Sequence, residues 1–113
     1  AVLVGRDDDP APTAAAVLAG DGGTIEVTVD GVTMHLEGHD MAAVPSDHTY
    51  ELWLVQPDSS VVAAGLFRPD ADGSLDASMP VELGDATGLA VTLEPVGKSS
   101  AGPTGPVLFT ADL

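Results

Sequence analysis

The stretch 24-TIEVTVDGVTMHLE-37 alternates apolar and polar residues on both sides of the dipeptide Asp30-Gly31. Alternation with a period of two is typical of strands with one buried face, and Asp-Gly is the dipeptide best suited to a two-residue type I′ turn. The stretch therefore predicts a β-hairpin in which Val29 lies opposite Val32. This register places six apolar side chains on one face, toward a core: Ile25, Val27, Val29, Val32, Met34 and Leu36.

The same period of two continues outside the hairpin, and turn residues interrupt it about every 8 to 12 residues. Further strands are expected at residues 14–19, 50–55, 61–67, 75–83, 89–93 and 107–111. No helical periodicity rivals this pattern. The series predicts an all-β protein, an antiparallel β-sandwich of about seven or eight short strands, with a small closed barrel as the alternative.

The stretch YELWLV, residues 50–55, is apolar on both faces and is therefore expected to be a central strand that is covered twice. Gly65 is expected to let a large neighbour approach its strand closely, and Pro80 indicates an edge strand or a bulge. Trp53 is expected to be buried between the sheet and a covering loop. The expected core residues outside the hairpin are Tyr50, Leu52, Trp53, Leu54, Phe67 and Val91.

Composition limits the classes of function. The chain has 113 residues, with 3 Lys or Arg and 18 Asp or Glu, which gives a formal net charge of -15. Binding to nucleic acid or to an anionic lipid surface needs a basic patch, so neither partner is expected. An apolar fraction of 44% is too high for a disordered acidic tail. The length suits one domain with one core.

The N-terminal residues differ in composition from the rest of the chain. Residues 1–13 open on an apolar stub without an initiator methionine and continue with three adjacent aspartates and two prolines. We expect them to form a linker or juxtamembrane tether, and residues 14–113 to form the folded domain. Because the chain opens so abruptly, we also expect it to be a fragment or a processed form. Cysteine is absent, which removes disulfides and thiolate chemistry.

Catalytic and calcium-binding patterns are weak. The nucleophile motif Gly-x-Ser-x-Gly is absent, and the adjacent residues Ser46-Asp47-His48 cannot converge as a triad must. Asp70-x-Asp72-Gly73-x-x-Asp76 groups carboxylates around a glycine, but it lacks the remaining ligands of an EF-hand loop. We therefore expect a turn at this position, no catalytic residue and no enzyme activity.

A second candidate is a copper site. Imidazole and thioether groups suit copper, and His39, Met41 and His48 lie in one predicted loop, where they could converge. Met34 and His35 are neighbours in a strand and point to opposite faces, so they cannot join the same site. The alternative is that the methionines pack in the core and the histidines are solvated. We predict this alternative, with no metal site and no cofactor.

The central segments resemble a known family, the C-terminal domain of anti-sigma-K factors. The resemblance covers roughly residues 14–111, and it rests on the order and spacing of several segments together. These segments are YELWLV at 50–55, AGLF at 64–67, DG at 72–73, AVTLEP at 90–95 and GPTGPV at 102–107.

The resemblance implies a regulatory role without catalysis. Members of this family are single-span membrane proteins of actinobacteria and other bacteria. An N-terminal cytoplasmic segment holds an extracytoplasmic-function sigma factor, and the C-terminal β domain lies outside the cell membrane, where it controls regulated proteolysis of the anti-sigma factor. This chain would be that outer domain, joined to the membrane by an upstream helix. Its sigma factor would bind the N-terminal part and not this chain, and a regulatory protease would be a further partner.

Two other classes of function remain open at this point. The chain can be a free-standing secreted β-sandwich that binds a ligand, for example copper through His39, Met41 and His48. It can also be an enzyme, although no catalytic motif supports this. A membrane span before residue 1 would favour the regulatory domain, and a cleavable signal peptide there would favour the secreted module.

Overall fold

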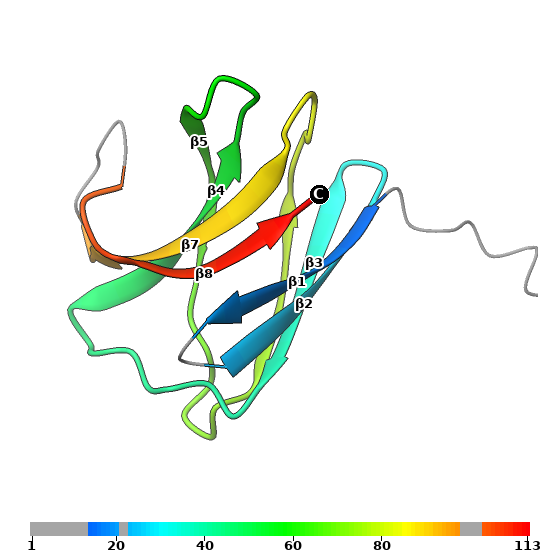
Figure 1. The fold of residues 1–113 in the computed structure, drawn as a ribbon. Coiled ribbons are helices and arrows are strands. Elements are labelled where there is room, and N and C mark those ends of the chain that lie inside the picture. Colours follow the sequence, from blue (N-terminus) through cyan, green and yellow to red (C-terminus); the bar gives the residue numbers. More distant parts are fainter. Residues whose placement is uncertain (1–13, 21–22, 98–102) are drawn as a thin grey trace, which may run out of the picture.

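The computed structural model describes residues 14–20, 23–97 and 103–113 (Figure 1). The expected tether at residues 1–13 lies outside the described residues, as does part of the long loop that precedes the last strand.

The described residues form eight strands and no helix, which confirms the all-β prediction. Every pair of neighbouring strands is antiparallel, and the order in the sheet is β5-β4-β7-β8-β1-β2-β3-β6. The strands are β1 (Ala14–Gly20), β2 (Gly23–Asp30), β3 (Thr33–His39), β4 (His48–Val55), β5 (Val61–Phe67), β6 (Leu75–Pro80), β7 (Gly88–Pro95) and β8 (Val107–Asp112).

The sheet is folded into two facing halves (Figure 1). Strands β5, β4, β7 and β8 form one half, and β1, β2, β3 and β6 form the other. The halves are joined where β8 pairs with β1, and within the described residues this pairing comprises Ala19↔Thr110 and Gly20↔Phe109. At the opposite side the edge strands β5 and β6 approach each other without pairing. The result is a nearly closed sheet that is intermediate between a sandwich and a barrel.

The β2–β3 hairpin forms with a register that differs by two residues from the prediction. Val29 lies opposite Met34, and the two-residue loop is Gly31-Val32 rather than Asp30-Gly31. A type I′ turn at Asp30-Gly31 would need a positive φ at both residues. In the observed turn only Gly31 has one, of 65°, which matches a type II′ turn with glycine at its first central position.

The change in register leaves most of the hairpin's inner face intact. A shift of two residues keeps each side chain on its own side of the sheet, because side chains alternate with a period of two. Five of the six expected inner side chains are accordingly buried, namely Ile25, Val27, Val29, Met34 and Leu36. Val32 is the exception: it lies in the turn, and 64% of its surface is exposed.

The core fills the space between the two halves. The ring centroid of Tyr50 lies 5.4 Å from that of Phe67 and 5.9 Å from that of Phe109, and the three residues lie on β4, β5 and β8 of the same half. Aliphatic side chains from all the remaining strands surround these three rings. The six side chains named above for the core outside the hairpin are all buried.

Two local expectations concerning strand positions are confirmed. Strand β4 pairs on both sides, with β5 and with β7, so it is internal to its half. Strand β6 is an edge strand, and it ends at Pro80 instead of continuing to residue 83. Gly65 lies against Met79, whose Sδ would be 2.7 Å from a Cβ atom added at the glycine.

Substitution by alanine should lower the free energy of unfolding by different amounts at Gly20 and at Gly65. A Cβ at Gly20 would lie 1.8 Å from the backbone oxygen of Leu108, which cannot move without breaking the junction of the two halves. The obstacle at Gly65 is the flexible thioether of Met79, which can adopt another rotamer. Gly20→Ala should lower the free energy of unfolding in urea by about 1–3 kcal/mol, and Gly65→Ala should cost less. Equal costs would contradict this view of the junction.

Candidate functional site

A cluster of polar side chains is buried on the outer face of strands β4 and β7, away from the main core. Trp53 extends from β4 on the face opposite Leu52 and Leu54, and Thr92 and Glu94 extend from β7 on the same side as Trp53. Only 1% of Trp53, none of Thr92 and 4% of Glu94 is exposed. On this outer face Glu94 is contacted by Thr104 and Gly105, which lie shortly before β8.

Hydrogen bonds connect the three side chains in one direction. The indole Nε1 of Trp53 donates to Oγ1 of Thr92 at 2.8 Å, and that hydroxyl donates to Oε2 of Glu94 at 2.6 Å. A threonine hydroxyl can accept one bond and donate another, so Thr92 satisfies the indole and the carboxylate together. Trp53 is therefore buried, as expected, and the hydrogen bond to Thr92 anchors its indole.

The Glu94 carboxylate is also held by the segment that leads into β8. The backbone N–H of Thr104 lies 3.1 Å from both carboxylate oxygens, and the N–H of Gly105 donates to Oε2 at 3.1 Å. The Thr104 hydroxyl donates to Oε1. A Cβ at Gly105 would lie 1.7 Å from the backbone oxygen of Leu93, so only glycine permits this approach. We call Trp53, Thr92, Glu94, Thr104 and Gly105 the Glu94 clamp.

The clamp keeps its carboxylate ionised. Burial alone would raise the pKa of Glu94, but hydrogen bonds from the side chains of Thr104 and Thr92 and from the backbone of Gly105 and Thr104 outweigh it. Together they lower the pKa from 4.5 to about 2. A carboxylate that accepts several N–H and O–H bonds is stabilised in its charged form in this way.

A pocket of about 220 Å³ opens beside the clamp, on the same outer face. Its walls include Leu66 on β5, Glu51 on β4 and the segment Pro95–Gly97, which is the end of β7 and the turn that follows it. Burial raises the pKa of Glu51, and the negative charge of Glu94 raises it further. The pocket therefore combines aliphatic walls with a carboxylate that is less well solvated than a surface glutamate.

Arg68 closes one side of this pocket with its guanidinium group turned to the backbone. It donates to the backbone oxygen of His48, to that of Val44 at 3.1 Å and to that of Pro45 at 3.3 Å. These bonds fix the loop between β3 and β4, and they use the positive charge of Arg68 for structure.

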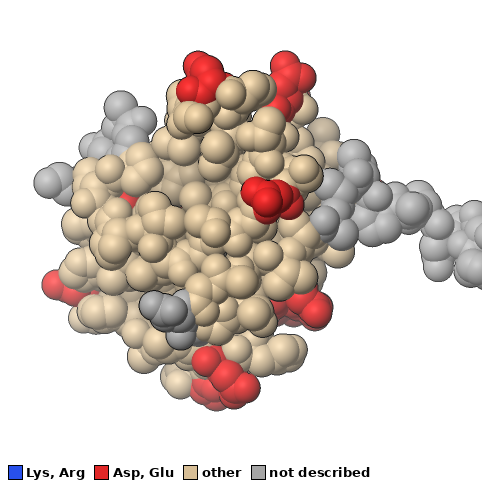
Figure 2. Space-filling model, in the orientation of Figure 1, with Lys and Arg blue, Asp and Glu red and all other residues tan. Residues whose placement is uncertain are grey.

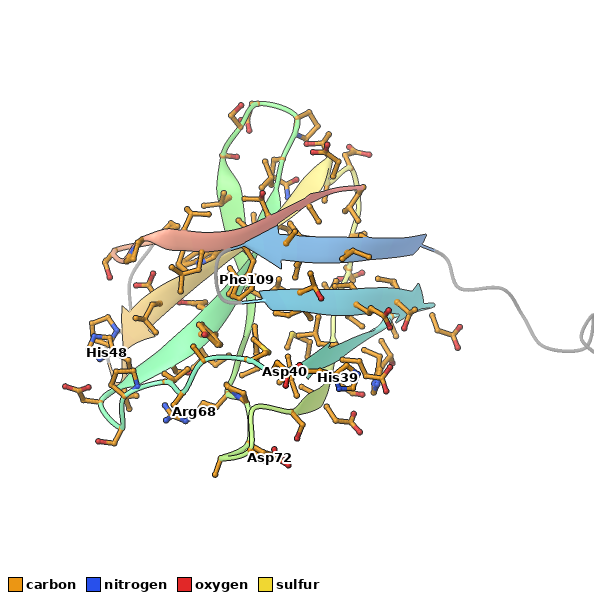
Figure 3. The ribbon with its side chains drawn as sticks, turned by 60° about the horizontal axis from the view of Figure 1, so that its bottom comes forward. His39, Asp40, His48, Arg68, Asp72 and Phe109 are labelled. Carbon is orange, nitrogen blue, oxygen red and sulfur yellow. The ribbon has the colours of Figure 1, made fainter. Side chains whose placement is uncertain are left out.

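The candidate copper ligands do not converge. Met41 is 5% exposed and belongs to the core, with its sulfur against Gly38. His39 lies exposed at the end of β3 beside Asp40, whereas His48 lies at the start of β4, far across the molecule (Figure 3). His48 Nδ1 is 2.7 Å from an oxygen of Asp47. Among the described residues no group of three His, Cys, Asp or Glu side chains could hold a metal ion.

The other candidate motifs have local structural roles. Asp70 and Asp72 accept hydrogen bonds from Ser74 and so shape the turn before β6, while Asp76 lies on β6 with an oxygen 3.3 Å from His35 Nε2. The predicted hairpin register would place His35 opposite Glu26, whereas in the observed register it lies opposite Thr28 on β2 and Ser78 on β6. Of Ser46-Asp47-His48, the last two are hydrogen-bonded neighbours at the entrance to β4.

Sequence reasoning missed the clamp. Its signal was present in the stretch AVTLEP at 90–95, where Thr92 and Glu94 share one face of a strand whose other positions are apolar. A polar pair of this kind normally indicates a solvated face, but here Thr92 contacts Trp53, and Glu94 is held by Thr104 and Gly105. The four residues besides Trp53 were therefore not among the predicted site residues.

The fold and the clamp define a small all-β domain whose polar centre is structural, beside a surface pocket. The family model for the anti-sigma-K factor RskA, C-terminal, matches residues 1–107. The chain belongs to this family, which confirms the resemblance found in its segments and assigns it a regulatory role in an anti-sigma factor. A sigma factor is the partner that the family implies. Comparison with curated proteins and with solved structures gave no match.

The family is generally associated with membranes. Within the part of the chain that the structure describes, none of the elements is a helix with the length and apolarity of a membrane span.

The clamp predicts a pH-dependent contribution to stability. Because the pKa of Glu94 is lower in the folded state, its contribution is complete above a pH of about 4.5 and is lost as the pH falls toward about 2. Glu94→Gln should lower the free energy of unfolding at pH 6 by about 1–3 kcal/mol, since charge-assisted hydrogen bonds are lost. The difference between parent and variant should shrink between these pH values.

The control is Glu82→Gln, which removes an exposed carboxylate outside the clamp. It should change the free energy of unfolding by no more than about 0.5 kcal/mol. Urea unfolding of the parent and both variants across this pH range tests the prediction. A cost of Glu94→Gln that does not change with pH would show that the carboxylate charge is not what the clamp holds.

Proposed function

We propose that this chain is the extracytoplasmic regulatory domain of a single-span membrane anti-sigma factor. In this proposal the domain has no enzymatic activity, and it controls the release of an extracytoplasmic-function sigma factor through regulated proteolysis. The sigma factor binds a part of the protein on the cytoplasmic side, outside residues 14–113. The observation that carries the proposal is the family match over residues 1–107, nearly the whole chain.

The charge of the chain supports this placement. Lys and Arg are retained preferentially on the cytoplasmic side of membranes, and this chain has 3 of them against 18 Asp and Glu. On the face drawn in Figure 2 acidic side chains are spread around the surface, and no lysine or arginine is visible among its described residues. Such a surface also disfavours contact with anionic lipid headgroups, which suits a domain held near a membrane but not on it.

A reporter experiment in cells tests control of release. The full-length protein is expressed with its sigma factor and a sigma-dependent promoter, carrying either Trp53→Ala or Val32→Ala. Removing the buried indole should cost about 3–5 kcal/mol of stability and expose the domain to proteolysis. Transcription should rise with Trp53→Ala, together with a shortened fragment on a blot for the N-terminus. Val32 is exposed in its turn, so Val32→Ala should behave like the parent.

Sidedness is measured in the same strain with a membrane-impermeant maleimide. The chain has no cysteine, so Val32→Cys introduces one exposed thiol and Val27→Cys introduces a buried one on the same hairpin. The first should react in intact cells and the second only after denaturation. Reaction of Val32→Cys only after lysis, or unchanged transcription and an intact protein with Trp53→Ala, would contradict the proposed function.

A further inference from the structure

The pocket beside the Glu94 clamp has the shape and lining of a small-molecule site. It is formed by β4, β5 and the segment Pro95–Gly97 at the end of β7, and its volume is about 220 Å³. Leu66 and Val96 line it and are 62% and 56% exposed, so each presents aliphatic surface to a ligand. Removing that surface from water is the main gain available to a bound aliphatic chain.

The charges that line the pocket are not equally available. Arg68 gives its guanidinium donors to backbone oxygens of the loop between β3 and β4. The carboxylate of Glu94 already accepts hydrogen bonds from the donors of the clamp. Within the described residues the carboxylate of Glu51 makes neither a hydrogen bond nor an ion pair, while its backbone lies between Leu66 and Thr92 in the sheet. Among the charged groups that line the pocket, the Glu51 carboxylate is therefore the one with hydrogen-bonding capacity left for a ligand.

A carboxylate in this position favours a cation. Burial and the nearby Glu94 charge both raise the pKa of Glu51, which means that its ionised form is poorly stabilised by its surroundings. An ammonium group beside it would supply the missing donors and the opposite charge, and a charge-assisted bond of this kind is among the stronger hydrogen bonds. The net charge of -15 also concentrates cations at the surface.

We propose that this pocket binds a primary alkylamine, with the ammonium group on Glu51 and the methylene chain along Leu66 and Val96. The site is independent of the proposed function: the binding test uses the 113-residue chain alone and measures nothing about sigma-factor release, so either proposal can fail without the other.

The test is an NMR titration of the chain with n-pentylamine. We expect saturable shifts of the Leu66 and Val96 methyl signals with millimolar affinity, as suits a ligand of this size. n-Pentanol has the same chain without the charge and should bind at least about tenfold more weakly, as should pentanoate. A blocked Gly-Lys-Gly peptide is titrated in parallel, and tighter binding of pentylamine than of the peptide would identify a free amine rather than a lysine side chain as the ligand.

Two variants and a matched control locate the site. Glu51→Gln should weaken pentylamine binding by at least about tenfold. Leu66→Asn changes an exposed side chain and leaves Glu51 in place, so this variant should fold like the parent. It should also weaken binding, because it removes an apolar wall of the pocket. Glu82→Gln removes an exposed charge elsewhere and should leave the affinity unchanged. Lys98 carries a primary ammonium group, as pentylamine does, and it follows Gly97 of the pocket lining in the sequence. The titrations are therefore also run on Lys98→Gln, in which this competing group is removed.

The proposal is overturned by any of three results. Pentanol binding as tightly as pentylamine would show that the carboxylate does not recognise the ligand. Full affinity in both Glu51→Gln and Leu66→Asn would place the amine elsewhere. No saturable binding of either amine probe, in the parent and in Lys98→Gln alike, would exclude an amine site.

Discussion

The buried carboxylate of Glu94 is the constraint on which the closure of this fold depends. It lies on the outer face of β7, where a charge is tolerated only if donors surround it, and the donors come from Thr92 and from the segment at Thr104 and Gly105. Those bonds fix the start of β8. Strand β8 pairs with β7 in its own half and with β1 in the other half, so the junction of the two halves lies between β8 and β1.

The position of Phe109 follows from that of β8. Phe109 pairs with Val91 on β7 and with Gly20 on β1, and its ring meets Tyr50 in the core. The contact with Gly20 is so close that a methyl group there would collide with the backbone of Leu108. A chain of contacts therefore runs from the clamp through β8 to the centre of the core, and it includes the junction at which β8 and β1 join the halves.

The clamp also determines which charged side chain beside the pocket is available to a ligand. Burying Trp53 on the outer face required a hydrogen-bond partner for its indole, and Thr92 supplies it while it bonds Glu94. With Glu94 satisfied in this way and Arg68 bonded to backbone, Glu51 is the charged residue that remains beside the pocket. The segment Pro95–Gly97 belongs to both regions, because it follows Glu94 directly and lines the pocket. A ligand in the pocket would therefore lie next to the element that holds the fold closed.

Much of the fold could be predicted because its strands are locally specified. The alternation at residues 24–37 determined which face is buried even though the hairpin register was wrong by two residues, since a shift of two preserves the faces. The register depended on whether Asp30 or Val32 would join Gly31 in the turn, and both choices gave the same alternation. The family resemblance came from the order of several segments and not from any single residue, and the family match confirms it.

The site could not be predicted in the same way, because its residues are distant in sequence. Thr104 and Glu94 are ten positions apart, and they meet across a loop whose path no periodic pattern determines. Met41 is a different case: it is close in sequence to His39 and His48, but the prediction that methionines pack in the core is the one that its position agrees with, since it lies inward against Gly38. Closeness in sequence offered a candidate metal site, whereas packing determined where each side chain lies.

Amide hydrogen exchange of Thr104 and Gly105 is the most direct measurement of whether Glu94 holds the fold closed. Their N–H groups bond to the Glu94 carboxylate and to no regular strand, so this carboxylate is what should protect them. We predict slow exchange of both amides at pH 6 in the parent chain. In Glu94→Gln both should exchange fast, the Phe109 amide should lose part of its protection, and the Val27 amide in the hairpin should keep its own. Fast exchange of Thr104 and Gly105 in the parent, or equal protection in Glu94→Gln, would contradict this account.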